Sequence, residues 1–260
     1  MDAGSIEELF AQTLVGDYEW DQEPRRAVLE LQRLGSREVF DYAAAWIRSD
    51  DPLRRVRGLD VMAQLGKTIG NPYHSFPEEA FEVVAQALEG ECEADPLESA
   101  ISALGQIGDE RAIPLIAAFH RDPNDCIRLR AAIALGRFAD TAPAIEALLT
   151  LMEDPDGVVR DWATFGLGVQ GHQDTAAIRD ALCRRLPDED DCAREEAIVG
   201  LARRQDTRVL PKLLEALQQP EISHRIIESA YTMLGMDTDR GEWSGQDYIN
   251  ALRERFGSQG

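Results

Sequence analysis

Residues 122–140 read DPNDCIRLRAAIALGRFAD, and this stretch decides the fold. Ile127, Ala131 and Leu135 follow one another at intervals of four, so they lie on one face of a helix. That face is apolar but small, which suits a helix with close neighbours on both sides. Gly136 follows the last of these residues, and a glycine there predicts a left-handed helix end.

The same pattern recurs along the chain, which indicates internal repeats. A leucine recurs at intervals of 31, 39, 31, 32, 34 and 33 residues, at Leu34, Leu65, Leu104, Leu135, Leu167, Leu201 and Leu234. Glycine follows six of the seven leucines, and Ala202 is the exception. The single long interval contains residues 67–76, KTIGNPYHSF, whose Gly, Asn, Pro and Ser predict an inserted loop.

A second apolar helix is predicted upstream of each of these helices. Its start is marked by an aspartate, a residue that satisfies free backbone N–H groups at a helix N-terminus. These aspartates are Asp109, Asp140, Asp174 and Asp206. Each repeat is therefore predicted to be a helical hairpin.

The repeats resemble HEAT repeats, most closely the short bacterial type first described in phycobilisome lyase-like proteins. The resemblance is carried by residues 122–140, by DPDGVVRDWATFGLGVQG (154–171) and by DCAREEAIVGLARRQD (191–206). It implies an all-α fold: a right-handed α-α superhelix, or α-solenoid, of about seven helical hairpins with a terminal capping helix. We expect a single solenoid domain over 1–260, with an N-terminal cap pair at 1–35, repeats at 36–236 and a capping helix within 237–260.

An aspartate in the hairpin turn is followed six residues later by an arginine in the second helix. If hairpins stack in register, each arginine reaches the aspartate of its own or a neighbouring hairpin. We therefore predict a structural ladder of Asp51 with Arg57, Asp122 with Arg128, Asp154 with Arg160, and Asp188 with Arg194.

The composition excludes several function classes. With 48 acidic and 27 basic residues among 260, the formal charge is −21, which disfavours nucleic acid and anionic membranes as partners. No 18-residue apolar run predicts a membrane span, and the first residues lack a signal-peptide pattern. Because the four cysteines also suit a reducing compartment, we expect a cytoplasmic protein, and we favour a monomer.

No motif predicts chemistry. His74, His120, His172 and His224 lie in different repeats, and no Cys-His spacing indicates a zinc site. Phosphate-binding and nucleophile-elbow motifs are absent from the sequence. We therefore predict no catalytic residue, no metal and no cofactor.

Two surfaces are candidates for binding a partner. The second helices of HEAT repeats line the concave side, where we predict a groove made of Arg130, Ile133, Asp161, Trp162, Phe165, Glu195, Glu196 and Val199. The alternative for Trp162 and Phe165 is packing between neighbouring helices.

An acidic patch is the other candidate. Residues 68–110 contain ten acids and neither Lys nor Arg, and the patch consists of Glu78, Glu79, Glu82, Glu89, Glu91, Glu93, Asp95 and Glu98. Such a run either keeps a protein soluble or docks a basic partner. Tyr73, His74 and Phe76 of the inserted loop border it as possible apolar anchors.

We expect a non-enzymatic scaffold or adaptor that binds a partner protein, a basic one, in the concave groove. Trp162→Ala should then weaken binding without unfolding the chain. One alternative is an immunity-type inhibitor that neutralises a basic enzyme by acidic charge mimicry. Another is a factor that assembles a chromophore or cofactor, as phycobilin lyases do. Recognition of damaged DNA would need a basic concave surface, which the charge argues against.

Overall fold

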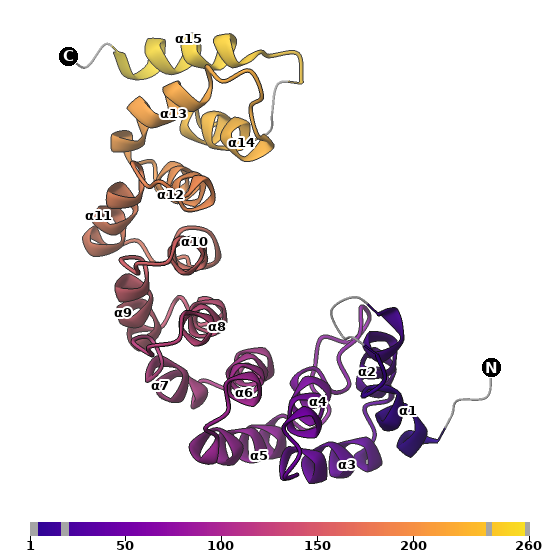
Figure 1. Cartoon of the computed structure of the whole chain (residues 1–260). Coiled ribbons are helices and arrows are strands. Elements are labelled where there is room, and N and C mark those ends of the chain that lie inside the picture. The colour runs from indigo at the N-terminus through magenta and orange to yellow at the C-terminus, as the bar shows by residue number, and fades with distance from the viewer. Residues whose placement is uncertain (1–4, 17–20, 238–240, 258–260) are drawn as a thin grey trace. The chain divides into compact units, whose positions relative to one another are not determined.

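The computed structural model describes residues 5–16, 21–237 and 241–257, and the elements named there are all helical. They form seven consecutive hairpins and one last helix (Figure 1). The hairpins are α1 (Ile6–Gln12) with α2 (Gln22–Leu34), α3 (Arg37–Ile47) with α4 (Pro52–Ala63), α5 (Pro77–Gly90) with α6 (Ala94–Ile107), α7 (Ala112–Ala117) with α8 (Asp125–Gly136), α9 (Ala142–Leu151) with α10 (Gly157–Phe165), α11 (Ala176–Arg185) with α12 (Asp191–Arg203), and α13 (Leu210–Ala216) with α14 (His224–Met233); α15 (Gly245–Phe256) follows.

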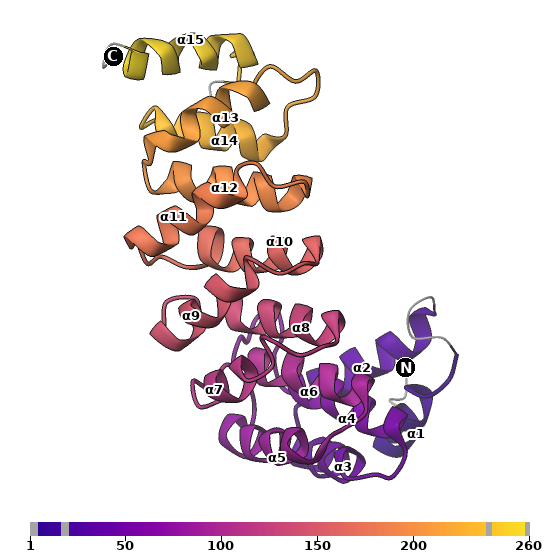
Figure 2. The same ribbon diagram turned by 60° about the vertical axis from the view of Figure 1, so that its left-hand side comes forward.

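The chain divides into two compact units, Met1–Ala134 and Leu135–Gly260. Within each unit, the first helices of the hairpins form one layer and the second helices another (Figure 1). In the first unit α4 packs between α2 and α6, and in the second unit α12 packs between α10 and α14 (Figure 2). The final helix, α15, packs against α14. The predicted all-α solenoid of hairpins with a terminal helix is therefore confirmed.

Small buried side chains let these helices approach one another. In α8, Ala131 and Leu135 are fully buried, and Ala163 of α10, Ala197 of α12 and Ala230 of α14 are fully buried at the corresponding positions. An alanine adds little bulk and loses no side-chain entropy, so a helix can bury both flanks against neighbours at short distance. The predicted apolar face of the second helices is confirmed.

The glycines that follow the repeat leucines have two different roles. Gly35, Gly66 and Gly235 have φ values of 56°, 85° and 68°, so they end helices in the left-handed conformation as predicted. The prediction was wrong for Gly105, Gly136 and Gly168, none of which has a positive φ, and Gly136 is the last residue of α8. Gly105 lies inside α6, whose left-handed cap is Gly108, and Gly168 lies inside a π-helical segment, η1 (Gly166–Gln170), that continues α10.

Gly105 and Gly168 allow close helix packing instead of ending a helix. An ideal Cβ on Gly105 would lie 2.7 Å from the Cβ of Ala134, and one on Gly200 would lie 2.8 Å from the Cα of Gly168. Any side chain at these positions would push the neighbouring helix away. The sequence pattern alone does not distinguish this role from a helix stop.

A buried arginine replaces the missing glycine where the repeat has Ala202. The guanidinium of Arg204 donates hydrogen bonds of 2.7–3.5 Å to the carbonyl oxygens of Leu167, Gly168, Gly171, Gln173 and Gly200. The side chain is only 9% exposed. Arg204 thus satisfies carbonyl groups that the π-helical end of α10 leaves free, because guanidinium has donors and no acceptor.

The predicted aspartate caps hold for one of the four first helices. Asp206 accepts a hydrogen bond from the backbone N–H of Arg208 and begins the 3-10 turn η2 (Thr207–Val209) before α13. The N-cap residues of α9 and α11 are Thr141 and Thr175, and Arg111 precedes α7. Asp109 also accepts from the backbone N–H of Arg111, but in the turn that precedes α7, whereas Asp140 and Asp174 hold the side chains of His172 and Arg179.

Candidate functional site

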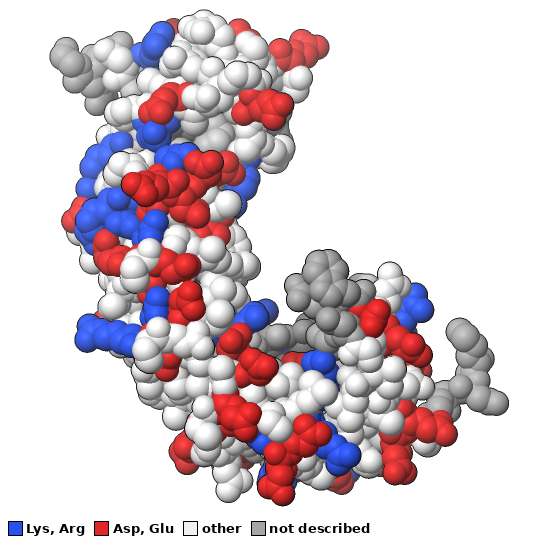
Figure 3. All heavy atoms as spheres, viewed as in Figure 1, with Lys and Arg blue, Asp and Glu red and all other residues white. Residues whose placement is uncertain are grey.

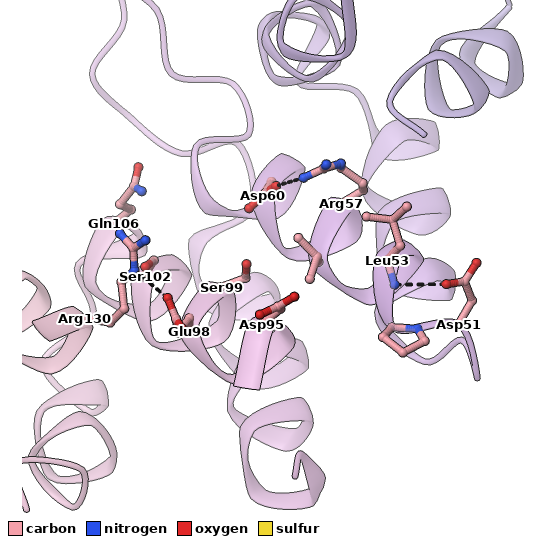
Figure 4. Close-up of a pocket in the computed structure, with 12 residues that line it drawn as sticks. Asp51, Leu53, Arg57, Asp60, Asp95, Glu98, Ser99, Ser102, Gln106 and Arg130 are labelled. Carbon is pink, nitrogen blue, oxygen red and sulfur yellow. Dashed lines mark hydrogen bonds and ion pairs between the residues drawn. The ribbon is translucent and has the colours of Figure 1, made fainter. Parts of the chain in front are cut away.

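A groove in the first unit lies on its layer of second helices. It has a volume of about 680 Å³, and α4, α6 and α8 supply its walls (Figure 4). Its lining consists of Asp51, Pro52, Leu53, Val56, Arg57, Asp60, Asp95, Glu98, Ser99, Ser102, Gln106 and Arg130. Four carboxylates and two guanidinium groups therefore face one open cavity.

Each of the two arginines is held by a carboxylate of the same groove. Arg57 donates to Asp60 at 3.1 Å and to the backbone oxygen of Thr13 at 3.0 Å, and Arg130 donates to Glu98 at 3.1 Å (Figure 4). Burial raises the pKa of the Asp60 carboxyl, although the Arg57 charge acts in the opposite direction. These two pairs neutralise the centre of the groove and fix its side chains.

At the end of the groove near the N-termini of α4 and α6, a carboxylate remains available to bind a partner. Asp95 is exposed and forms no ion pair or hydrogen bond with any residue that the structure describes. Asp51 caps α4 by accepting from the N–H of Leu53 and lies 3.7 Å from the exposed Arg54. Beside them, Leu53 is 43% exposed. An available carboxylate next to an exposed aliphatic side chain suits a basic residue with an apolar stem or neighbour.

The predicted acidic patch is largely paired in the folded chain. Arg37 of α3 binds Glu79, Arg55 of α4 binds Glu91 and Glu93, Arg111 binds Glu82, and Arg130 of α8 binds Glu98. Blue basic side chains accordingly lie among the red acidic ones over this part of the surface (Figure 3). Among the described residues, only Glu78, Glu89 and Asp95 of the patch form no such contact.

The Arg55–Glu91 pair is the most buried of these contacts. Arg55 donates to the two oxygens of Glu91 at 2.7 and 3.2 Å, and the Glu91 carboxylate also accepts from the N–H groups of Cys92 and Glu93. Burial alone would raise the pKa of Glu91, but these hydrogen bonds outweigh it and lower the pKa. This glutamate therefore has a structural role between hairpins.

The ladder residues form two kinds of contact in the second unit. Arg160 binds Asp188 of the next hairpin with two hydrogen bonds, of 2.9 and 2.7 Å, which hold the pKa of that carboxyl below its usual range. Within their own hairpins, Arg160 and Arg194 donate instead to the backbone oxygens of Asp154 and Asp188. In the first unit, Arg128 donates likewise to the backbone oxygen of Asp122.

The pairing expected for the first ladder position differs in the structure. Arg55, not Arg57, takes the equivalent place, because it donates to the backbone oxygens of Ser49 and Asp50 and binds Glu91 of the next hairpin. Arg57 instead lines the groove, and Asp51 caps α4. The turn before α4 is displaced by two residues relative to the later turns, so an offset counted from Asp51 selects the wrong arginine.

The residues of the predicted groove fall into both units and are described in each separately. In the first unit, Arg130 is exposed and Ile133 is half-buried. In the second unit, Trp162 is 37% exposed and packs edge-on against the half-buried Phe165, with ring centroids 5.7 Å apart. Val199 and Glu196 are buried. Much of this set therefore packs between helices.

The acidic members of that set surround one arginine of α14. Arg225 binds both oxygens of Glu196 and lies 3.8 Å from Glu195, which also accepts a hydrogen bond from Ser223 at 2.9 Å. Asp161 has an oxygen that is buried and without a hydrogen-bond partner. Burial, together with the charges of Glu196 and Asp190, raises the pKa of Asp161 to about 6.

The remaining candidates for chemistry lie apart. Cys92, Cys126 and Cys192 are exposed, Cys183 is half-buried, and all four are free thiols. Among the described residues, no three His, Cys, Asp or Glu side chains are grouped so that they could hold a metal ion. None of the described helices has the length and apolar character needed to cross a bilayer.

Sequence reasoning missed most of the groove in the first unit. Leu53, Val56, Asp60, Ser99, Ser102 and Gln106 line it, and only Asp51, Arg57, Asp95, Glu98 and Arg130 had been selected, for other reasons. One signal was present: Asp60, Ser99 and Ser102 are polar residues within apolar helices. Which faces of α4 and α6 look into a shared cavity follows only from their packing.

Known proteins with similar sequences and structures are consistent with this architecture. A family model of HEAT repeats matches residues 81–168 and 145–235. Protein YibA of Escherichia coli is 37% identical over 115 residues, which are 44% of this chain and 40% of YibA, so the match spans less than half of that relative.

Solved structures resemble a larger part of the chain. The crystal structure of YibA has a TM-score of 0.72 at 22% identity and covers 95% of this chain and 92% of that one. An engineered protein has a TM-score of 0.58 at 19% identity over 90% of this chain and 68% of its own. At such identities the likeness shows the fold alone. Because the family model covers more than half of the chain, this protein belongs to the HEAT-repeat family.

Proposed function

We propose that this chain is a non-enzymatic interaction scaffold whose first unit binds a basic segment of a partner protein in the groove between α4 and α6. The observation that carries the proposal is the charge balance of the groove. Its two arginines are already paired with Asp60 and Glu98, and Asp51 with Arg54, so Asp95 supplies the unpaired carboxylate for a partner. HEAT repeats generally mediate protein interactions, and a solenoid presents such surfaces on its helix layers.

The shape of the groove supports a peptide segment as its occupant. Its volume of about 680 Å³ accommodates several side chains. Leu53 and Val56 give it an apolar wall, and Ser99 and Ser102 add hydroxyl groups that donate to or accept from a peptide backbone. A cationic side chain would thus contact carboxylates at one end while its neighbours contact aliphatic carbons.

Two other functions are less favoured by the side-chain arrangement. Charge mimicry of a polyanion needs a field of unpaired acids, and five of the eight residues in the acidic patch are bound to arginines. Attachment of a chromophore would need a nucleophile, and the groove lining contains neither cysteine nor histidine.

Peptide selection provides a direct test. A displayed library of random 12-residue peptides is selected against the whole chain, and affinities of the recovered peptides are measured by fluorescence anisotropy. We expect Arg or Lys in the recovered sequences, with affinity falling as salt increases because exposed ion pairs are screened. Asp95→Asn should weaken binding by about fivefold, because it removes the charge that pairs with the basic residue.

Glu89→Gln is the matched control, since Glu89 is another unpaired acid of the patch and lies outside the groove lining. Its affinity should match that of the unmodified chain. Trp162→Ala tests the alternative surface on α10. Peptides without basic residues, or peptides weakened by Trp162→Ala and not by Asp95→Asn, would show that the groove is not the binding site.

A further inference from the structure

The inserted loop 67–76 displays the two most exposed large apolar side chains described in the chain. Ile69 has a relative exposure of 111% and Tyr73 of 76%. Of the three anchors predicted from the sequence, only Tyr73 is exposed in this way, because His74 is buried and Phe76 is half-buried. Ile69 was not among them. Exposed Ile and Tyr side chains close together on one short loop are a typical feature of a protein-binding surface.

The tip of this loop is held in one conformation by its own hydrogen bonds. Thr68 and Asn71 form a small antiparallel bridge, with backbone N–O distances of 2.7 and 3.1 Å. The Asn71 side chain donates to the backbone oxygen of Gly66 at 3.0 Å and accepts from the N–H of Tyr73 at 3.3 Å. Both exposed side chains therefore flank a rigid turn, which lowers the entropy that binding would cost.

The base of the loop is fixed to the core. The His74 ring accepts from the N–H of Phe76 at Nδ1, so it is neutral and donates from Nε2 to the Met62 oxygen at 2.7 Å. Phe76 packs edge-on against Phe40 with ring centroids 5.4 Å apart, and the Arg37 guanidinium lies 4.0 Å from the centre of the Phe76 ring. A loop anchored in this way has a fixed position in the first unit.

The loop stands at the opposite end of the groove from Asp95. The ammonium group of Lys67 donates to the backbone oxygen of Gln106, whose side chain lines the groove. Asp95 and Gln106 lie 11 residues apart near the two ends of α6, which corresponds to about 16 Å along the helix axis. The groove thus has an acidic end and an end that Lys67 of the loop contacts.

We infer that Ile69 and Tyr73 form a second contact for the same partner segment, which carries a basic residue for Asp95 and an apolar residue for the loop. The spacing follows from the length of α6: about five residues separate the two if the segment is extended, and about 11 if it is helical. This inference depends on the proposed function, because it extends the basic segment from the groove onto the loop.

The test uses the peptides selected against the whole chain. We expect their sequences to contain an apolar residue at one of these two distances from the Arg or Lys. The double variant Ile69→Ser with Tyr73→Ser should weaken binding by about tenfold. Replacing the apolar residue of the peptide by Ser should cost the same factor, and combining both changes should cost little more, because each removes the same contact.

Leu29→Ser is the matched control, since Leu29 is 57% exposed on α2 and does not line the groove. Circular dichroism melting verifies that each variant is folded, and Tyr73→Ala alone replaces the double variant if that one unfolds. Weakening by Asp95→Asn but not by the loop variants would overturn this inference and leave the proposed function standing. Weakening by the loop variants but not by Asp95→Asn, or by neither, would overturn both.

Discussion

The second helices of the two units are built from the same repeat, but their packing differs. In the second unit, Gly168 and Gly200 face each other, so η1 and α12 come into backbone contact. In the first unit, Gly66, which follows α4, faces Gly35 and the inserted loop residue Ser75. The inserted loop therefore packs against the end of this helix, while α4 itself packs against α2 and α6.

The same repeat thus provides both a tightly packed stack and a layer with an open groove. In the second unit, polar groups of this layer bind one another, as Arg225 does with Glu196. In the first unit, the same layer leaves polar side chains such as Asp95 and Ser99 beside a cavity. Changes to either arrangement should separate effects on stability from effects on binding.

The largest effect is expected from Arg204→Ala in the closed unit. The change leaves carbonyl oxygens of five residues without their guanidinium donor, and buried unsatisfied acceptors are costly. We expect a loss of about 4 kcal/mol in the free energy of unfolding, measured by urea denaturation. The exposed neighbour Arg203 is the control, and Arg203→Ala should cost less than about 1 kcal/mol. Similar losses for both variants would contradict this role of Arg204.

A smaller effect is expected from Gly200→Ala. The new Cβ would lie 2.8 Å from the Cα of Gly168, so η1 and α12 must separate, at a cost of about 1–3 kcal/mol. Gly90 is the control at the end of α5, because a Cβ there meets no atom within 4 Å. Gly90→Ala should be neutral or stabilise the chain by up to about 1 kcal/mol, because alanine favours helix. Equal melting temperatures for the two variants would show that the glycine contact is unimportant.

The smallest effect is a pH dependence at Asp161. Its pKa is about 6 in the folded chain, above the ordinary value of 3.8, so the folded state binds the proton more tightly than the unfolded state does. Stability should therefore fall as the pH rises from about 4 to 6, and the penalty should remain above that range. Because the side chain is half-buried and solvent screens part of the interaction, we expect about 1 kcal/mol.

Asp161→Asn should accordingly stabilise the chain at pH 7.5, and the gain should disappear near pH 4, as measured by urea denaturation across this range. The exposed Glu146 on α9 provides the control, with Glu146→Gln changing stability by a few tenths of a kcal/mol at most. A gain that is the same at pH 4 and pH 7.5 would mean that the charge of Asp161 is not its cause.

The sequence alone determined the fold, because repeat packing depends on neighbours in the chain. The spacing of Leu135, Leu167 and Leu201 and the small residues before them predicted the hairpins, since in each unit the described helices pack mainly within one hairpin or on the next. The same periodicity located the insertion at 67–76 from one long interval. These features are local, so the spacing of residues along the sequence is enough to recognise them.

Charge pairing and the groove were decided by the tertiary structure. The run 68–110 lacks basic residues, but stacking brings Arg37, Arg55 and Arg130 from other hairpins onto its carboxylates. Likewise, the same leucine–glycine pair occurs where the glycine ends a helix, as Gly35 does, and where the glycine allows a neighbouring helix to pack closely, as Gly168 does. A side chain's partner depends on distances between hairpins, which residue spacing within one hairpin does not contain.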